Sequence, residues 1–368
     1  MKNGLYITDE KLFSDNAKTN GVIKKILTQI EELNIEGQLS CKPLILPRIE
    51  KNAVYNGISY ILLDIYKKVP VDSCYYDFIY IRRIIPVNYS LVKLLRKIKG
   101  NNKKCKIIYE IPTYPYVKEQ KDIRSKIIFF IDLLFLSKLK NYINRIATFS
   151  NHDEILGIPT IKIMNGIRCV DVPIRTPETS NQNINLIAVA QFAFWHGYDR
   201  LIEGLNAFYK NTINKKIYIH LVGDGPELIS YRQLVKQYNL SRYVIFHGSL
   251  FGEKLTEVFN NADIAVCSLG VHRVGIFLGS FLKSREYLAR GIPMVSSTKI
   301  DILPDDFKYC LYVPEDESPV DMYHVIEFYQ NLQKYQTSQG IIHEIRRFAE
   351  NNCDMSKTMQ PVINYFRE

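Results

Sequence analysis

Short apolar runs alternate with longer stretches of helical periodicity along most of the chain. An apolar run of about four to eight residues between polar or turn residues is typical of a buried strand, whereas apolar positions three and four apart are typical of a helix. In the first half this pattern predicts strands at 5–8, 78–81, 106–110, 146–149 and 160–163. Helices are expected between them, at 22–32, 89–98 and 123–143.

The same alternation begins again after residue 185. Strands are predicted at 186–190, 216–222, 244–247, 264–268, 294–297 and 310–313. Helices are predicted at 200–209, 226–238, 254–260 and 282–290, and a last helical pattern covers 341–366. Alternation of strands and helices of this kind predicts α/β units with parallel sheets.

A polar segment with two prolines separates the two halves. It reads PIRTPETSNQNIN at 173–185, and we interpret it as a linker because it has little periodicity. The predicted organisation is therefore a first α/β domain at 1–172, a second at 186–336 and C-terminal helices at 337–368.

Composition and charge narrow the class of protein. The 368 residues are 46% hydrophobic and 23% charged, which is typical of a globular protein and long enough for two domains. The net charge of +10 is uneven, because residues 1–170 hold 28 basic and 16 acidic side chains, whereas the remainder is close to neutral. The first half is expected to meet an anionic partner: a membrane surface, a nucleic acid or a phosphorylated substrate.

Several classes of protein do not fit the sequence. The start, MKNGLY followed by Asp9 and Glu10, predicts no signal peptide, and the longest apolar run, at 127–136, contains Asp132 and is too short to cross a bilayer. The seven cysteines form no CxxC pair and the histidines no HExxH motif. This pattern favours reduced thiols in a cytoplasmic protein and argues against a zinc site.

A glycine-containing turn in the second half could bind an anion. The segment LVGDGPEL at 221–228 places Gly223 and Gly225 between a strand and a helix. Free N–H groups at a helix start bind anions, but a tight turn needs the same glycines without any ligand. The sequence leaves these two interpretations equally open.

A second candidate follows the strand at 264–268. The loop SLGVHR at 268–273 precedes LKSREYLARGIP at 282–293. Lys283 and Arg285 near a helix start are suited to neutralise phosphates, and Glu286 is suited to accept hydrogen bonds from ribose. The alternative is a solvated helix face with a Glu286–Arg290 pair.

Five segments together resemble a known family. They are AVAQFAFWHGYDRLIEGL (188–205), LVGDGPEL (221–228), VIFHGSL (244–250), ADIAVCSLG (262–270) and LKSREYLARGIPMV (282–295), with a weaker NGI at 165–167. In this order they resemble the nucleotide-sugar-binding domain of glycosyltransferase family 4, and in particular its bacterial polysaccharide-biosynthesis members. The resemblance implies the GT-B fold, in which two Rossmann-like domains with parallel sheets face a central cleft and the last helix crosses back to the first domain.

The chain departs from the family pattern around the donor phosphates. The Arg and Lys that commonly hold the diphosphate fall on Gln191 and His196, and the first of two family glutamates falls on Leu278 while the second fits Glu286. His196 could still hydrogen-bond a phosphate, although a lone histidine is more often structural. The cations that could replace them are Arg273, Lys283 and Arg285. His272 is expected beside the sugar.

Two positions of the first half fit the acceptor side of the family. Gly21 fits the loop that closes over the donor phosphate, and its alternative is an ordinary helix start capped by Thr19 or Asn20. Glu110 ends a predicted strand and is the candidate to orient or deprotonate the acceptor hydroxyl.

Basic and apolar residues of the first half suggest contact with a membrane. Seven of the nineteen residues at 91–109 are basic and none is acidic, and the apolar run IIFFIDLLFL at 127–136 lies between basic flanks. Lysines attract anionic head groups, and an apolar helical face adds burial. For the lysine cluster membrane contact is favoured, whereas for the apolar helix packing inside the domain is favoured.

The combined expectation is a hexosyl-type glycosyltransferase of bacterial cell-surface polysaccharide synthesis, such as capsule. It would take a nucleoside diphosphate sugar, act with retention and without metal or cofactor, and work on a glycan or lipid-linked acceptor in the cytoplasm or at the inner face of the membrane. Glu110, His272 and Arg273 are expected in catalysis, and the donor would be bound by Gly21, Gln191, His196, Gly223, Gly225, Lys283, Arg285 and Glu286. The alternative is a catalytically silent GT-B partner of another transferase; nucleic-acid binding is not expected, because no recognised motif is present.

Overall fold

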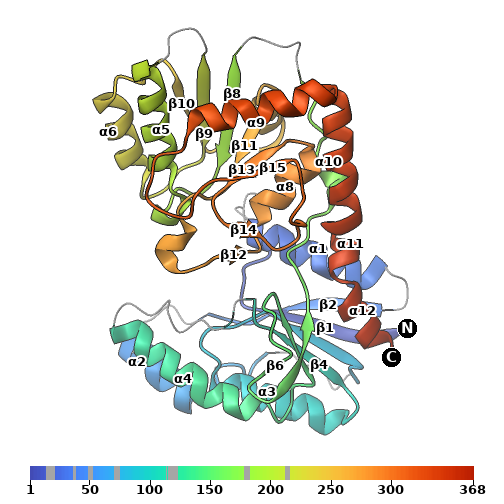
Figure 1. The fold of residues 1–368 in the computed structure, drawn as a ribbon. Coiled ribbons are helices and arrows are strands. Elements are labelled where there is room, and N and C mark those ends of the chain that lie inside the picture. Colours follow the sequence, from blue (N-terminus) through green and yellow to red (C-terminus); the bar gives the residue numbers. More distant parts are fainter. Residues whose placement is uncertain are drawn as a thin grey trace. The chain divides into compact units, whose positions relative to one another are not determined.

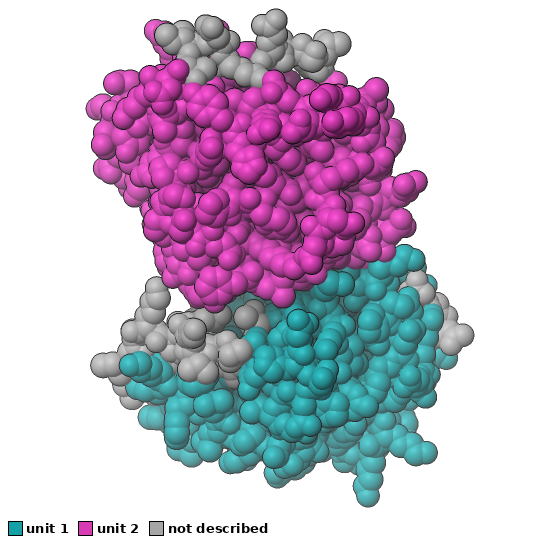
Figure 2. Space-filling view, in the orientation of Figure 1, with its two compact units in different colours: residues 1–164, 355–368 teal, residues 165–354 magenta. Residues whose placement is uncertain are grey.

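The computed structural model describes residues 1–13, 21–35, 39–48, 53–69, 75–112, 114, 123–177, 183–211 and 216–368. These residues form two compact units (Figure 2). Unit 1 comprises residues 1–164 and 355–368, and unit 2 comprises residues 165–354.

Unit 1 is built on a seven-stranded sheet with the order β2-β1-β3-β4-β5-β7-β6 (Figure 1). Every neighbouring pair is parallel except β6 and β7. The strands are β1 (Lys2–Thr8), β2 (Leu39–Ile45), β3 (Phe78–Ile81), β4 (Lys106–Glu110), β5 (Arg145–Thr148), β6 (Glu154–Ile155) and β7 (Ile158–Lys162). The central strands are covered on both faces, which is why they appear in the sequence as continuous apolar runs.

Helices cover both faces of this sheet. One face carries α2 (Ala53–Leu62), α3 (Tyr89–Asn101) and α4 (Ile123–Leu139), and the other carries α1 (Gly21–Ile35), α11 (Met355–Thr358) and α12 (Gln360–Arg367). Side chains alternate between the faces, so that Ile79 packs toward α3 and α4 while Phe78 packs toward α1 and α12.

The segment 355–368 completes unit 1 although it follows unit 2 in the sequence. Phe366 is fully buried, and its ring centre lies 4.6 Å from that of Phe78. Lys2 Nζ donates hydrogen bonds to the carbonyl oxygens of Phe366 at 2.8 Å and Arg367 at 2.7 Å. The last helix therefore supplies part of the core on one face of the unit 1 sheet.

Unit 2 is built on a six-stranded parallel sheet with the order β10-β9-β8-β11-β13-β15. Its strands are β8 (Ile184–Val189), β9 (Ile217–Val222), β10 (Val244–Gly248), β11 (Ile264–Val266), β13 (Met294–Ser296) and β15 (Cys310–Tyr312), and a separate pair is formed by β12 (Leu278–Gly279) and β14 (Lys299–Ile300). One face is covered by α5 (Tyr198–Asn211), α6 (Leu228–Gln237) and α9 (Met322–Tyr335), the other by α7 (Gly252–Asn260), α8 (Leu282–Arg290) and α10 (Ser338–Asn352). Short 3-10 turns are η3 (Cys169–Asp171), η4 (Phe194–His196) and η5 (Val271–Val274).

The predicted class, two α/β units with parallel sheets, is confirmed, but the boundary between the units differs from the prediction. The units divide between Met164 and Asn165, and the described parts of the expected linker, 173–177 and 183–185, belong to unit 2. Arg175 is buried there, where its amide donates to the Arg290 carbonyl at 2.9 Å and its guanidinium donates to the Ala262 carbonyl. The side chain and the amide of Arg175 therefore both bind backbone oxygens of unit 2.

A buried polar cluster lies at the carboxyl ends of the central strands of unit 1. Glu110 is fully buried; Lys25 Nζ lies 3.1 Å from its Oε1, which the Arg82 guanidinium also contacts. The Tyr80 hydroxyl donates to Oε2 at 2.6 Å. Burial by itself would raise the pKa of Glu110, but the charges of Lys25 and Arg82 and the Tyr80 hydrogen bond outweigh it and lower the pKa to about 2.

This environment does not fit the predicted role of Glu110 as a base. Both carboxylate oxygens already accept hydrogen bonds, and a carboxylate with a pKa of about 2 takes up protons poorly near neutral pH. Glu110 does end β4, as predicted, but it serves there as the counter-charge of the buried Lys25 and the partly buried Arg82.

Phe366→Ala is expected to lower the free energy of unfolding by about 3–5 kcal/mol, because it removes a fully buried ring from the unit 1 core. Urea denaturation followed by circular dichroism measures this change. Tyr335→Ala is the control, since its ring is 81% exposed, and its effect should be below about 0.5 kcal/mol. Similar effects of the two substitutions would contradict the packing of α12 on unit 1.

Glu110→Gln should change how stability depends on pH. The pKa of Glu110 is lowered from 4.5 to about 2 in the folded protein, so its stabilisation is complete above about pH 4.5 and is lost as the pH falls toward 2. This shift corresponds to a loss on the order of 3 kcal/mol. In urea denaturation between pH 7 and pH 3, the wild type should lose most of this stability, whereas Glu110→Gln should be less stable at pH 7 and lose less on acidification.

The exposed Glu253 provides a matched control for this experiment. Glu253→Gln should follow the wild-type curve. If Glu110→Gln also followed that curve, the ion cluster would not contribute to stability.

Candidate functional site

The strands of the unit 2 sheet are parallel, so the loops that follow them meet at one edge. The residues described below lie in or next to the loops that follow β8, β9, β11 and β15. Ligands of open α/β sheets bind outside the carboxyl ends of the strands. This edge, which we call the carboxyl edge of unit 2, is the candidate site.

A buried arginine ties three of these loops together. Arg200, in the first turn of α5, is 1% exposed. Its guanidinium donates to the carbonyl oxygens of Leu269, of Pro314 at 2.9 Å and of Ser318 at 2.7 Å. The loops after β8, β11 and β15 are thereby held in one arrangement.

Glycines allow two of these loops to touch. Gly197 has a φ of +64°, and a Cβ atom placed there would lie 2.5 Å from the backbone nitrogen of Gly270. The amide of Leu269 donates to the carbonyl of His196 at 2.7 Å across the same contact. Only glycine fits this position, because a side chain would separate the two loops.

Gly223 and Gly225 serve a similar packing role. Cβ atoms at these positions would lie 1.8 Å from the Ala190 carbonyl oxygen and 2.4 Å from the Phe192 carbonyl oxygen, respectively. The Gly223 amide donates to the Gly248 carbonyl at 2.7 Å, and the Gly225 amide to Asp224 Oδ1 at 2.7 Å. Because both amides are already bonded, the predicted anion site at this turn is not supported; the glycines bring the loops after β8 and β9 together.

Lys283 places a positive charge near the loop that follows β8. It lies in the first turn of α8; its Nζ donates to the Tyr198 hydroxyl at 3.2 Å and lies 5.6 Å from the centre of that ring. Removal of the ammonium group from water lowers the pKa of Lys283 to about 8. Within the described part of the chain no carboxylate forms an ion pair with Lys283, so its charge is available to an anionic ligand.

His196 lies close to this lysine and is uncharged. Its ring stacks on Tyr198 with a centre distance of 5.7 Å, and its Nδ1 accepts a hydrogen bond from the Ala193 amide at 3.0 Å. Burial, together with the charge of Lys283, lowers the pKa of His196 to about 3. The proton is therefore on Nε2, and His196 can donate a hydrogen bond but does not replace the charge of a lysine.

Arg273 and His272 are brought together with acidic partners. The Arg273 guanidinium binds Asp199 at 2.7 Å, the Phe194 carbonyl at 2.7 Å and the Glu317 carboxylate. His272 Nε2 lies 2.8 Å from Glu317 Oε1. Hydrogen bonds from Arg273 lower the pKa of Glu317 to about 2. Arg273 therefore clamps loops at the carboxyl edge, and two carboxylates already neutralise the cation predicted for catalysis.

Arg285 also makes structural contacts inside unit 2. It is fully buried, pairs with Asp301 and donates to the Asn165 carbonyl at 3.0 Å. Its hydrogen bonds to Ser284 and Ser280, at 3.1 and 3.3 Å, complete this environment. The prediction that Arg285 binds donor phosphates does not fit these contacts, because its charge is used inside unit 2.

Glu286 forms the helical pair that the sequence offered as an alternative. Its Oε1 accepts from Arg290 at 2.9 and 3.1 Å, and its side chain remains 29% exposed.

Gln191 is exposed and lies just after β8. Gly21 is the first residue of α1 in unit 1, and its proposed capping residues, Thr19 and Asn20, lie outside the described residues.

Sequence reasoning missed several residues of the carboxyl edge. Arg200, Tyr198 and Glu317 were not singled out, although they connect the loops or contact Lys283. Trp195 is the only tryptophan of the chain and is 42% exposed beside His196. Its place in the segment FWHGYDR, between a strand and a helix, was the signal that could have drawn attention to it.

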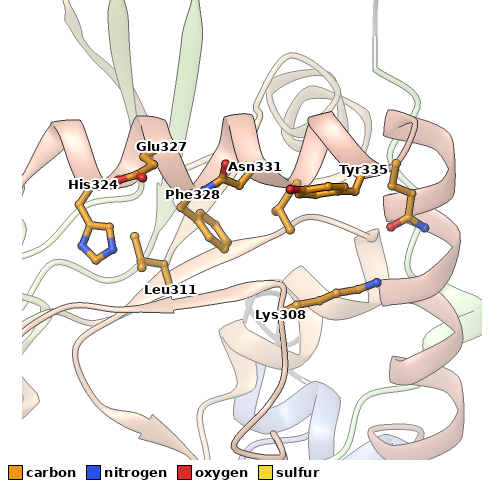
Figure 3. A pocket seen from close by; sticks show the side chains of 9 residues that line it. Lys308, Leu311, His324, Glu327, Phe328, Asn331 and Tyr335 are labelled. Atoms are coloured by element: carbon orange, nitrogen blue, oxygen red, sulfur yellow. The ribbon is translucent and has the colours of Figure 1, made fainter.

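A separate pocket of about 430 Å³ lies between α9 and β15 (Figure 3). Figure 3 shows His324, Phe328 and Tyr335 along α9, with Leu311 and Lys308 opposite. None of the predicted site residues lines this pocket.

Among the described residues no cluster of His, Cys, Asp and Glu is placed to hold a metal ion.

Known structures share the fold of the whole chain. Sucrose-phosphate synthase from Thermosynechococcus elongatus is 13% identical, with 100% of this chain and 98% of that chain covered and a TM-score of 0.64. HepE from Anabaena, in complex with UDP and glucose, is 12% identical over 100% of both chains, with a TM-score of 0.64. A glycosyltransferase from Rickettsia africae is 14% identical over 100% of this chain and 98% of that chain, with a TM-score of 0.60.

The sequence comparisons concern unit 2. No curated protein sequence matches the chain. Residues 174–308, which include α5, α8 and most of the carboxyl edge, match the family model described as glycosyl transferases group 1. This match, on a chain whose two α/β units have the GT-B fold, identifies the protein as a glycosyltransferase.

Proposed function

We propose that the protein transfers a hexosyl sugar from a nucleoside diphosphate donor to a growing glycan, with retention and without a metal ion. The family match and the GT-B fold support the reaction class. The observation that carries the proposal is Lys283, a cation without a carboxylate partner in the described part of the chain, at the start of α8 beside Tyr198 and His196.

Lys283 and the N-terminus of α8 are suited to hold the diphosphate. The helix begins at Leu282, and its N-cap residue, Phe281, has no side chain that accepts hydrogen bonds from the first amides. The amides and the helix dipole favour an anion, and the ammonium group adds a full positive charge. In the proposed reaction these groups stabilise the charge that develops on the departing diphosphate, in the place that a metal ion would otherwise take.

Neighbouring groups are assigned to the rest of the donor. The Nε2–H group of neutral His196 donates to a phosphate oxygen, and the partly exposed carboxylate of Glu286 accepts from ribose hydroxyls. HepE, a structure of similar fold, contains UDP-glucose in one of its complexes, which favours a UDP-sugar as the first donor to test. Catalysis then rests on stabilising the leaving group, because Glu110 is occupied by Lys25 and Arg82.

The proposed acceptor is a glycan or lipid-linked saccharide of bacterial cell-surface polysaccharide synthesis. We place the protein in the cytoplasm, peripheral at the inner face of the membrane. The support is the charge of residues 1–170, with 28 basic and 16 acidic side chains, and the resemblance of unit 2 to the polysaccharide-biosynthesis members of its family. An excess of positive charge favours an anionic surface.

A catalytically silent partner of another transferase is the second candidate. It is favoured by Gln191 and His196 at the family's Arg and Lys positions, and by the neutralisation of Arg273 by Asp199 and Glu317. A silent partner needs no donor, so nucleotide binding separates the two candidates.

Isothermal titration with UDP, GDP and dTDP tests the donor site. One of the three is expected to bind, and Lys283→Ala should weaken that binding roughly tenfold or more, because it removes a charge-assisted contact. Binding should also weaken as the pH rises through about 8, where Lys283 loses its proton. Lys283→Arg should keep most of the affinity and shift this loss to higher pH.

Lys299→Ala is the matched control, because Lys299 is an exposed lysine of unit 2 paired with Asp305. It should bind nucleotide as the wild type does. Unchanged binding by Lys283→Ala would remove Lys283 from the site, and no binding of any nucleotide by the wild type would favour the silent partner.

A ribose role for Glu286 predicts discrimination between UDP and its 2′-deoxy analogue if UDP is the preferred nucleotide. The wild type should bind UDP more tightly, whereas Glu286→Gln should bind both with similar affinity, because an amide is a weaker acceptor than a carboxylate. Isothermal titration gives both affinities, and circular dichroism checks the fold. Discrimination that survives in Glu286→Gln would place the ribose elsewhere.

A further inference from the structure

Helix α4 is apolar on the side that faces solvent as well as on the side that faces the core. Ile131, Phe135, Leu136 and Leu139 are buried in the core under the sheet of unit 1. The exposed large apolar residues of the same helix are Ile127 (55% exposed), Phe130 (69%), Leu133 (40%) and Leu134 (39%). A helix on a globular surface normally carries polar side chains on its outer face.

The acidic residue in this apolar stretch does not interrupt the exposed face. Asp132 is 1% exposed, accepts from the Val87 amide at 2.8 Å and pairs with Arg83 at 3.0 Å. It is turned toward the interior of unit 1. The outer side of α4 is therefore more apolar than its sequence suggests.

Helix α2 extends the same apolar surface. It packs beside α4, as Figure 1 also shows. At its end it exposes Ile58 (51%), Ile61 (40%), Leu62 (69%) and the following Leu63 (42%). We call these four residues and the four exposed residues of α4 the α2–α4 face. Soluble proteins rarely leave so many large apolar side chains together in water, so the face is expected to have a partner.

The charges around the face are positive. The exposed lysines of these two segments are Lys67 and Lys68 after α2 and Lys126, Lys138 and Lys140 along α4. Among the described residues of 57–69 and 126–140 the acids are Asp64 and Asp132, and each is paired with a basic residue, Lys93 or Arg83. A second copy of the chain would bring the same lysines against these, whereas an anionic lipid surface complements them.

The lysine cluster at 91–109 is a weaker candidate than the sequence suggested. Lys93 pairs with Asp64 at 2.8 Å, Lys99 donates to the Asn144 side chain at 3.1 Å, and Lys106 donates to the Tyr365 carbonyl at 2.7 Å. These contacts hold unit 1 together. The sequence favoured membrane contact for the lysine cluster and packing inside the domain for the apolar helix. Part of that helix does pack in the core, and our proposal below concerns its exposed side.

We propose that the α2–α4 face docks on an anionic lipid bilayer. Its apolar side chains enter the head-group region, and the surrounding lysines contact anionic head groups. Among the described residues no helix combines the length and apolar character needed to cross a bilayer, so α2 and α4 lie along the surface in this arrangement. The inference deepens the proposed function, because a lipid-linked acceptor would lie in the same surface.

Flotation with vesicles tests this surface. The wild type should float with vesicles of phosphatidylglycerol and phosphatidylethanolamine and much less with phosphatidylcholine alone. The double variant Phe130→Ser with Leu134→Ser should bind the anionic vesicles at least tenfold more weakly. Lys126→Glu with Lys138→Glu should lose the preference for anionic lipid. Wild-type flotation by both variants, or no flotation of the wild type, would overturn the proposal.

Controls separate membrane binding from folding and from donor binding. Phe251→Ser with Ile229→Ser alters exposed apolar residues of unit 2, 51% and 69% exposed, and should float as the wild type does. Sedimentation of the wild type should show a monomer; a dimer that the Phe130→Ser and Leu134→Ser variant abolishes, without vesicle binding, would assign the face to a second copy. Nucleotide titration of the same samples reports on the donor site independently, so failure of one proposal is distinguishable from failure of the other.

Discussion

The carboxyl edge of unit 2 depends on one buried cation. The Arg200 guanidinium is withdrawn from water, and it is accommodated because backbone carbonyls of Leu269, Pro314 and Ser318 accept its protons. Those carbonyls belong to loops that follow two different strands, and Arg200 itself follows a third. The loops are thus held in place before any ligand arrives, and a site that is already arranged loses less free energy in reorganising around developing charge.

Sequence patterns could predict the elements that are buried and locally encoded. The bounds of β3, β4 and α8 agree with those predicted from their sequence patterns. The two strands are short apolar runs packed on both faces, and the helix ends before Gly291. Strand β2 was missed because it is an edge strand with Lys42 and Pro43 exposed, and α2 was missed because its outer face is apolar and gives no helical alternation. Periodicity reveals a helix or an exposed strand only where one face of it is apolar and the other is polar.

The chemistry of the site was less predictable, because it depends on which charges are paired. Lys283, Arg285 and Arg273 are equivalent in the sequence, each a cation near a helix start. The acids that neutralise the two arginines are distant along the chain, with Asp301 sixteen residues from Arg285 and Glu317 forty-four from Arg273. Glu110 meets Lys25 across eighty-five residues. No local pattern records such partners, so only the fold separates an available cation from a structural one.

The return of residues 355–368 to unit 1 has a consequence for how the protein is made. A ribosome synthesises all of unit 2 before it reaches Phe366, so the nascent unit 1 exposes the apolar surface of Phe78 and its neighbours during that time. The first unit to leave the ribosome is therefore the last to complete its core. Chaperones that shield apolar surface during synthesis would act on unit 1 until the last helix has been released.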